Sequence, residues 1–271
     1  MNRSGVIKSS FSRGSVRMSM PLLFVSVCVL QVQADEELAD VLQTFGPGVI
    51  THKSDSADVN AVEEFVSADL DDRVFLIVAG DDRGKGMSFK VEAQADDRTV
   101  HLVHMGKGQV STILFTSSNL YRSQEVDDKT SSIARFSPAE PVLLSNQPAG
   151  TSVHSEIEVA VASIAKPNEI AHRGKLSCIY EVLGTYEVKT PAGVFETICI
   201  RTRYKGSVGP AEIDDSRYVF YAQGSGPIAL RTASHIQAMI FYNKTNKQSL
   251  LLHSTDHKPD TPPVAPTPPT K

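Results

Sequence analysis

The chain has 271 residues, of which 41% are hydrophobic, 21% charged and 7% aromatic, with no Trp and a formal net charge of −4. This balance is typical of a globular protein and excludes a coiled coil, a collagen and a wholly disordered chain. The length allows one large or two small domains, so neither a metal nor several disulfides are needed to stabilise a core.

The N-terminus has the pattern of a secretory signal peptide. Residues 1–34 carry four basic residues and no acidic one, and they contain the apolar run 21–30 followed by Val32-Gln33-Ala34. This order predicts cleavage after Ala34 and export to the periplasm or the extracellular space. The apolar run is too short to span a bilayer, which takes ~20 residues, so no stable transmembrane segment is expected after processing.

Loss of this leader makes the chain more acidic. The four basic residues go with it, which leaves 23 Lys and Arg against 31 Asp and Glu and a net charge of −8. No basic stripe compensates for that charge. An acidic surface is repelled by phosphate backbones, so nucleic acid is excluded as a partner.

The three cysteines raise two separate questions. Cys28 lies in the leader and offers lipid attachment as an alternative to simple cleavage, but Val27 precedes it where a small residue is expected. Cys178 and Cys199 remain in the mature chain. Export to an oxidising compartment makes a Cys178–Cys199 disulfide a candidate, and two buried thiols on neighbouring strands are the alternative. The sequence leaves both open.

The mature chain is expected to begin with a helical N-terminal segment over residues 35–72. Apolar residues recur at helical spacing over residues 35–46, before Gly46-Pro47-Gly48, and again over residues 59–66. At the other end, residues 257–271 contain six of the fifteen prolines, which predicts a disordered Pro-rich tail.

Between these ends, residues 73–256 predict an antiparallel β domain, because short β-rich runs alternate with turn clusters. The expected strands lie at 74–79, 87–94, 99–105, 109–116, 153–161, 176–182, 186–188, 195–204, 217–222, 227–236, 238–242 and 249–253. Turns are expected at 190–193 and 243–247, and residues 131–148 are expected to be irregular. The fold class is mainly β, a curved antiparallel sheet or half-barrel with one or two short N-terminal helices. Residues 73–130 and 151–256 form one sheet or two sub-sheets.

Four short motifs follow one another in the second half of the chain. They are Pro141-Val-Leu-Leu144, Pro148-Ala-Gly150, Pro191-Ala-Gly-Val-Phe195 and Tyr221-Ala-Gln-Gly-Ser-Gly226. This series resembles that of a family of exported or periplasmic bacterial β-sheet domains of unknown function. The resemblance implies a curved antiparallel sheet similar to the half-barrels of bacterial lipoprotein carriers, and it brings no catalytic residue.

The same motifs also have a direct physical interpretation as turns. Pro191 fixes φ at the entry of a turn, and Gly193 supplies a positive φ. Gly224 and Gly226 are expected to form a bend or bulge between two strands. Five Asp-Asp pairs, among them 214–215, are expected in solvated turns, where Asp side chains form local hydrogen bonds.

No motif predicts a catalytic residue, a cofactor or a metal site. The run 80–86 lacks the spacing and the hydroxyl of a phosphate-binding loop. Ser225 lies between two glycines, whereas a nucleophile elbow has its glycines two positions away on each side. His101 and His104 are three residues apart on a predicted strand, which places them on opposite faces.

The sequence therefore favours a non-catalytic exported envelope protein that binds a hydrophobic or glycan-like ligand, or a partner protein, on a β-sheet face. Two alternatives remain. An exported hydrolase with an unrecognised active site would bring a His together with carboxylates such as Glu156 or Glu158. A structural assembly component would be tethered by the Pro-rich tail.

Overall fold

The computed structural model describes residues 37–57, 59, 62, 65, 72–116, 118–238 and 242–255. The predicted leader, including Ala34 and Cys28, and the predicted tail lie outside these residues. Backbone contacts divide the chain into two units, Met1–Asp40 and Val41–Lys271. The described part of the first unit, residues 37–40, begins a helix that runs over residues 37–43. No helix of the described chain is long and apolar enough to cross a membrane.

The second unit is built from β-strands. The described residues form β1 (Ile50–Ser54), β2 (Arg73–Ala79), β3 (Gly86–Gln94), β4 (Asp97–Met105), β5 (Gln109–Phe115), β6 (Asn119–Asp127), β7 (Ser132–Leu144), β8 (Ser152–Ser163), β9 (Lys166–Thr190), β10 (Gly193–Val208), β11 (Ala211–Ala222), β12 (Gly226–Ala238) and β13 (Tyr242–Thr255). The prediction of a mainly β, antiparallel fold is confirmed.

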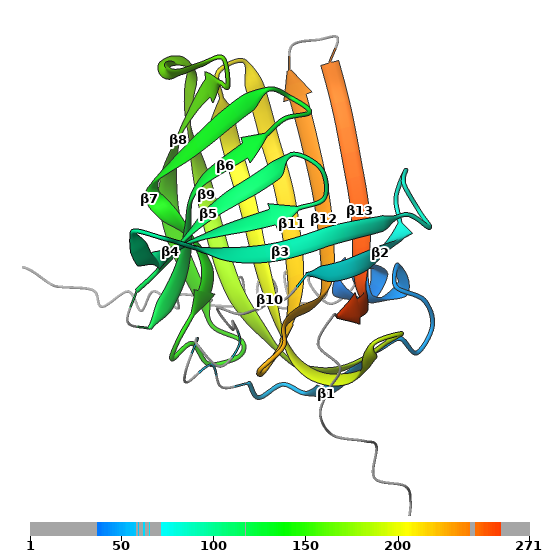
Figure 1. The fold of residues 1–271 in the computed structure, drawn as a ribbon. Helices are drawn as coiled ribbons and strands as arrows, with labels where there is room; N and C mark the ends of the chain where they lie inside the picture. Colours follow the sequence, from blue (N-terminus) through cyan, green and yellow to red (C-terminus); the bar gives the residue numbers. More distant parts are fainter. Residues whose placement is uncertain are drawn as a thin grey trace, which may run out of the picture. The chain divides into compact units, whose positions relative to one another are not determined.

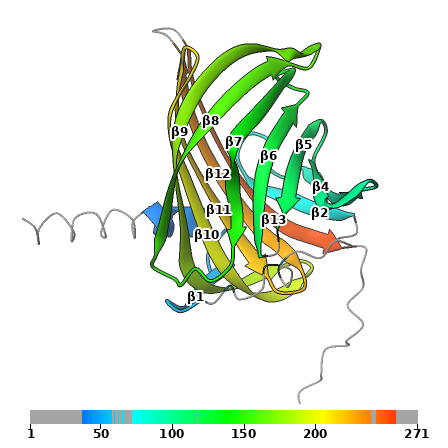
Figure 2. The same ribbon diagram turned by 90° about the vertical axis from the view of Figure 1, so that its left-hand side faces the viewer.

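Strands β2 to β13 form a closed barrel in which each strand pairs antiparallel with the next strand of the chain. The ring closes between β13 and β2, where Leu251 lies opposite Leu76. The expected open sheet or half-barrel is therefore a closed barrel, and the two candidate sub-sheets are one sheet (Figures 1 and 2). Closure removes the exposed strand edges that a half-barrel would leave.

The strand β1 was not expected, because the sequence predicted only helices before residue 73. It pairs with the last part of β9, where Ile50 lies opposite Val188. A Cβ added to Gly184 would come within 3.0 Å of the Ser54 carbonyl oxygen, so a glycine with positive φ lets the two strands approach. Gly184 also lies beside a register shift in the pairing of β9 with β10, and the predicted strands 176–182 and 186–188 are parts of the one strand β9.

Residues 131–148 were expected to be irregular, and this expectation is wrong, because β7 occupies most of them. The segment contains Pro138 and Pro141, which donate no ladder hydrogen bond, and the charged Glu140. The pairing with β6 shifts here, since Arg122 lies opposite Glu140 and Gln124 opposite Arg135. A bulge in β7 accommodates the irregular sequence without ending the strand.

The turn expected at residues 243–247 is also misplaced. Residues 242–255 belong to β13, and Ala238 lies opposite Tyr242. The polar sequence of residues 243–247 is typical of a turn, but it forms part of β13. Asn246 and Gln248 of this strand line a cavity of the barrel. Residues 239–241 lie outside the described chain.

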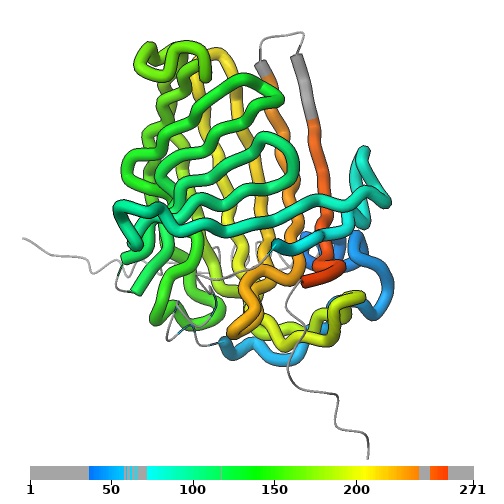
Figure 3. Tube along the Cα trace, viewed as in Figure 1, coloured from blue at the N-terminus to red at the C-terminus, as the bar shows by residue number. Residues whose placement is uncertain are grey.

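The barrel interior is made by alternation along the strands, as predicted for the second half of the chain. On β8, Ile157 and Val159 are buried while Glu156 and Glu158 are exposed, and β9 repeats the pattern around Leu176. In Figures 1 and 3, strands β3 to β5 run from side to side, whereas β11 to β13 run from top to bottom behind them. The steep crossing leaves the inward side chains of the two walls facing one another.

Apolar residues that follow β1 fill one part of this interior. Ala57, Val59, Val62 and Phe65 are buried in one cluster with inward residues of β5, β6, β7, β9, β10 and β11. The Asn146 N–H donates to the Val59 carbonyl at 2.7 Å and fixes this segment. The helix predicted over residues 59–66 lies largely outside the described residues.

Residues that directly follow the helix over residues 37–43 cover part of the outer face of the barrel. Phe45 packs edge-on against Phe220, with ring centroids 6.0 Å apart. Tyr186 also packs edge-on against Phe220, with ring centroids 5.5 Å apart. The Thr44 and Ser249 hydroxyls are 2.7 Å apart. Phe220 thus faces outward while its neighbours Val219 and Tyr221 line the interior cavity.

Candidate ligand-binding cavity

The barrel encloses a cavity of about 280 Å³ between its two walls. Side chains from β2 to β7 line one side, and side chains from β11, β12 and β13 line the other. Native cores contain few voids larger than a water molecule, so a space of this size is not ordinary packing. It is near the lower end of the range found for small-molecule sites, ~300 Å³.

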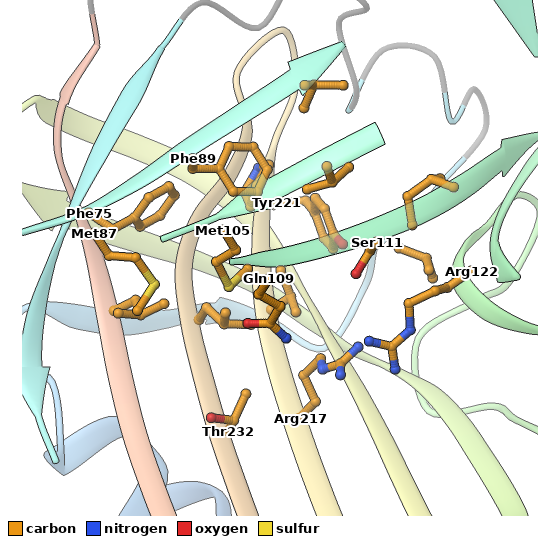
Figure 4. A pocket seen from close by; sticks show the side chains of 18 of the residues that line it. Phe75, Met87, Phe89, Met105, Gln109, Ser111, Arg122, Arg217, Tyr221 and Thr232 are labelled. Atoms are coloured by element: carbon orange, nitrogen blue, oxygen red, sulfur yellow. The ribbon is translucent and has the colours of Figure 1, made fainter. Parts of the chain in front are cut away.

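Most of the wall is apolar. Figure 4 shows Phe75, Met87, Phe89 and Met105 at one side of the cavity, away from the guanidinium groups. Phe75 and Phe89 contact each other edge-on, with centroids 5.6 Å apart. The apolar lining is completed by Val91, Val103, Ile113, Phe115, Leu120, Val142, Val219, Pro227, Leu230 and Leu250. The methionines add a surface that adapts to the shape of a bound molecule.

A buried ionic network borders the cavity on its other side. Glu140 is 1% exposed, and one of its oxygens accepts hydrogen bonds from Arg122 Nε at 3.0 Å and Nη2 at 2.5 Å. The other oxygen accepts from the Tyr204 hydroxyl. Arg122 also pairs with Glu125, whose second oxygen accepts from Gln109 Nε2 at 3.1 Å. The Arg122 guanidinium lies 5.0 Å from the Phe136 ring centre.

The network controls the ionisation of its members. Burial raises the pKa of the Tyr204 hydroxyl well above its usual value, and the Glu140 carboxylate adds to this. For Glu125, burial favours the neutral form, but Arg122 and Arg217 outweigh it and lower the pKa. Burial opposes the charge on Arg122, yet Glu140 and Glu125 raise the pKa of its guanidinium. The Glu125 carboxylate and the Arg122 guanidinium are thus held in their charged forms.

Arg217 lies on the cavity wall beside this network, and its guanidinium and that of Arg122 approach each other in Figure 4. Its side chain is 31% exposed, and its Nη1 is 3.4 Å from Glu140 Oε1. This is the only side-chain hydrogen bond of Arg217 among the described residues, and it is long. Sequence reasoning missed both arginines, although each stands at an inward position two residues from an apolar one.

His101 adds a further polar group to the wall and is 3% exposed. Its Nε2 is 3.1 Å from the Arg98 carbonyl oxygen, which fixes this nitrogen as the donor. Its Nδ1 has no hydrogen-bond partner among the described residues. The ring stacks at a tilt on Phe115, with centroids 4.2 Å apart.

The residues predicted to form turns lie at strand connections, away from the cavity network. Pro191 and Ala192 join β9 to β10, and Gly193 has φ +148°. Gly224 and Gly226 join β11 to β12, with φ near +69° and +68°. By contrast, Asp214 and Asp215 lie within β11 and not in a turn. Burial raises the pKa of Asp215.

The carboxylates expected of a hydrolase are outside the barrel. Glu156 Oε1 is 2.8 Å from Lys175 Nζ, and Glu158 Oε1 is 3.9 Å from it. All three side chains are exposed. The described residues that line the cavity include no carboxylate, so the structure does not bring Glu156 or Glu158 to a histidine there.

Cys178 and Cys199 are free and buried. Cys178 lies opposite Tyr204, and Cys199 lies opposite Gly184, so five residues of β10 separate their positions in the ladder. At ~3.3 Å per residue this is about 16 Å, whereas disulfides join Cα atoms less than ~7 Å apart. The candidate disulfide therefore does not form in this register.

We expect neither thiol to react with iodoacetamide in the folded protein at about pH 8. Burial raises the pKa of Cys178 to about 12 and raises that of Cys199 too, so the reactive thiolate is scarce until the chain unfolds. Mass spectrometry of peptides alkylated with and without denaturant measures this. Alkylation of either site in the native protein, or its absence in denaturant, would contradict the prediction.

No protein-family model matches the chain, and no curated protein matches it. The resemblance to the family with the Pro-Ala-Gly-x-Phe turn is thus not confirmed. Two solved structures are similar. A Bacteroides fragilis protein designated as exported, with a YmcC-like fold, has 13% identity and a TM-score of 0.38, over 67% of this chain and 91% of its own. A Parabacteroides distasonis protein designated as a lipoprotein has 12% identity and a TM-score of 0.39, over 73% and 98%. Similarities of this size assign neither ligand nor location.

Proposed function

We propose that this protein is a non-catalytic exported envelope protein that binds a hydrophobic small molecule inside its barrel. The cavity of about 280 Å³, with its aromatic, aliphatic and methionine lining, carries this proposal. Burial of apolar ligand surface against such a wall is favourable by roughly 25 cal/mol per Å². Export rests on the predicted leader, and the intact mass of the chain recovered from its host tests cleavage after Ala34.

The interior favours a hydrophobic ligand over a glycan or a docked protein. A glycan would need hydrogen-bond partners around its whole surface, and most of this wall offers none. The exposed large hydrophobic residues of the described chain are Val74, Ile164 and Val194, which lie on different strands or loops. An exterior apolar patch for a partner protein is therefore unsupported among these residues. The proposed site is inside the barrel and not on an outer sheet face.

Binding of N-phenyl-1-naphthylamine, a neutral dye that becomes fluorescent in apolar surroundings, tests the proposal. We expect saturable binding of one dye per chain. Val103→Phe places extra volume in the cavity and should weaken binding at least about tenfold, which corresponds to ~1.4 kcal/mol. Val194 is 64% exposed, so Val194→Phe makes the same exchange outside the barrel and should leave binding unchanged.

Ser111→Leu provides a second cavity-filling variant, since Ser111 also lines the wall. Thermal melts followed by circular dichroism show that each variant is folded before dye is added. A wild-type protein that does not bind the dye would overturn the proposal. So would folded Val103→Phe and Ser111→Leu variants that bind it as tightly as the wild type.

A further inference from the structure

The cavity wall is divided into an apolar part and a polar part. The apolar part is formed by the aromatic and methionine side chains of β2, β3 and β4 and by Leu230 and Leu250. The polar part is formed by Gln109, Ser111, Arg122, Arg217, Thr232, Asn246 and Gln248. Ser88 and His101 add polar groups to the wall on β3 and β4. Figure 4 shows this separation, with both guanidinium groups on the side away from Phe75 and Met87. A molecule that fills the space must therefore be amphiphilic.

Of the two arginines, Arg122 is already paired with two carboxylates. Its Nε and Nη2 donate to one oxygen of Glu140, and its Nη1 donates to Glu125. Its side chain is 9% exposed, and each of its three nitrogens already donates to a carboxylate. Its position fixes both carboxylates.

Arg217 is in the opposite situation. Its one described side-chain hydrogen bond is the 3.4 Å contact to Glu140 Oε1, and that oxygen already accepts from the Tyr204 hydroxyl. A guanidinium has five N–H donors, so Arg217 keeps most of them for other acceptors. A ligand that fills the cavity would remove the water around this cation, and the loss is compensated only if the ligand supplies an acceptor, best of all an anion.

We infer that the ligand is a single-chain amphiphile whose anionic head group, a carboxylate or a phosphate, is bound by Arg217 while its chain lies against Phe75, Phe89 and Met105. This inference rests on the proposed function. A cavity of about 280 Å³ has room for one short chain. The carboxylates of Glu125 and Glu140 do not exclude an anion, because the charges of Arg122 and Arg217 together balance those of the two carboxylates.

Calorimetric titration with dodecanoate and dodecyl phosphate below their micelle concentrations, and with dodecanol below its solubility limit, tests the inference. The three probes share one chain and differ in the head group. We expect at least one anionic probe to bind the wild-type protein about tenfold or more tightly than dodecanol, because charge-assisted hydrogen bonds to guanidinium are strong. Whichever anion is preferred identifies the head group as carboxylate or phosphate.

Arg217→Gln should reduce the ratio of anion affinity to dodecanol affinity to about one, and Arg217→Lys should retain part of it. Both affinities in this ratio are measured on the same variant, so a general loss of packing weakens the binding of the anion and of dodecanol alike and leaves their ratio unchanged. Arg83→Gln, in the exposed turn after β2, is the matched control and should keep the wild-type ratio.

The outcomes separate the two proposals. Equal affinities of the wild-type protein for dodecanol and both anions would overturn the anionic head group and leave the hydrophobic ligand standing. A ratio that survives Arg217→Gln would also overturn the role of Arg217. Failure of all three probes to bind would overturn the proposed function itself. The wild-type comparison decides the matter even if Arg217→Gln does not fold.

Discussion

Glu140→Ala is expected to lower the free energy of unfolding by about 3–5 kcal/mol, the usual cost of leaving a buried charge without its partner. Glu140 is 1% exposed and accepts hydrogen bonds from Arg122, Tyr204 and Arg217. Alanine would leave Arg122 with only Glu125 and would leave the Tyr204 hydroxyl without its acceptor. Urea unfolding followed by circular dichroism measures the change.

Glu156→Ala makes the same exchange at an exposed ion pair and serves as the control. Its partner Lys175 is also exposed, so the loss should be less than about 1 kcal/mol. An equal cost for Glu140→Ala and Glu156→Ala would contradict a structural role for the buried network. A double-mutant cycle sharpens this test, since Arg122→Met should cost less in a Glu140→Leu background than in the wild type.

The network also explains why part of the barrel was hidden in the sequence. Inward charged residues such as Arg122 and Glu140 break the alternation of apolar and polar residues that reveals a half-buried strand. On β7 two prolines add to the effect. Strand β6 was not predicted, and β7 was expected to be irregular, because Arg122 and Glu140 satisfy each other between these two neighbouring strands. No local pattern carries that information.

Where inward residues are apolar, the prediction was reliable. Leu176, Cys178 and Tyr180 on β9 were expected on one face, and all three are buried. The mainly β fold could be predicted from such segments, because apolar and polar residues alternate with a period of two within each of them. Closure of the barrel depends on β2 pairing with β13, whose residues are far apart in the sequence. Its register comes from long-range packing, so the open half-barrel was the wrong expectation.

For the candidate site, the sequence contained one usable signal. Residues 217–222 were predicted as a strand, and Arg217, Val219 and Tyr221 share a face of it. A cation that continues an inward apolar face indicates a polar position inside the barrel. The cavity around it could not be predicted, because its wall combines nine strands whose proximity only the closed ring establishes.

A second large effect is expected at Gly174, where β9 and β10 approach closely. A Cβ added to Gly174 would lie within 3.0 Å of the Ser207 carbonyl oxygen and the Val208 Cα, and both are backbone atoms. Gly206 has the same relation to the Lys175 carbonyl oxygen, so two glycines let the strands approach at this point. Neither has a positive φ, which leaves the contact distance as the reason for glycine.

Gly174→Ala should therefore lower the free energy of unfolding by about 2–4 kcal/mol, since neither strand can move without breaking the ladder. Gly86→Ala is the matched control. It also lacks a positive φ, and its added Cβ would meet only the Val74 Cγ1 atom at 3.3 Å. A side chain can yield where a backbone cannot, so we expect a change within about 1 kcal/mol. Equal urea midpoints for the two variants would show that β9 and β10 separate easily, and the barrel wall would then be less rigid than this register requires.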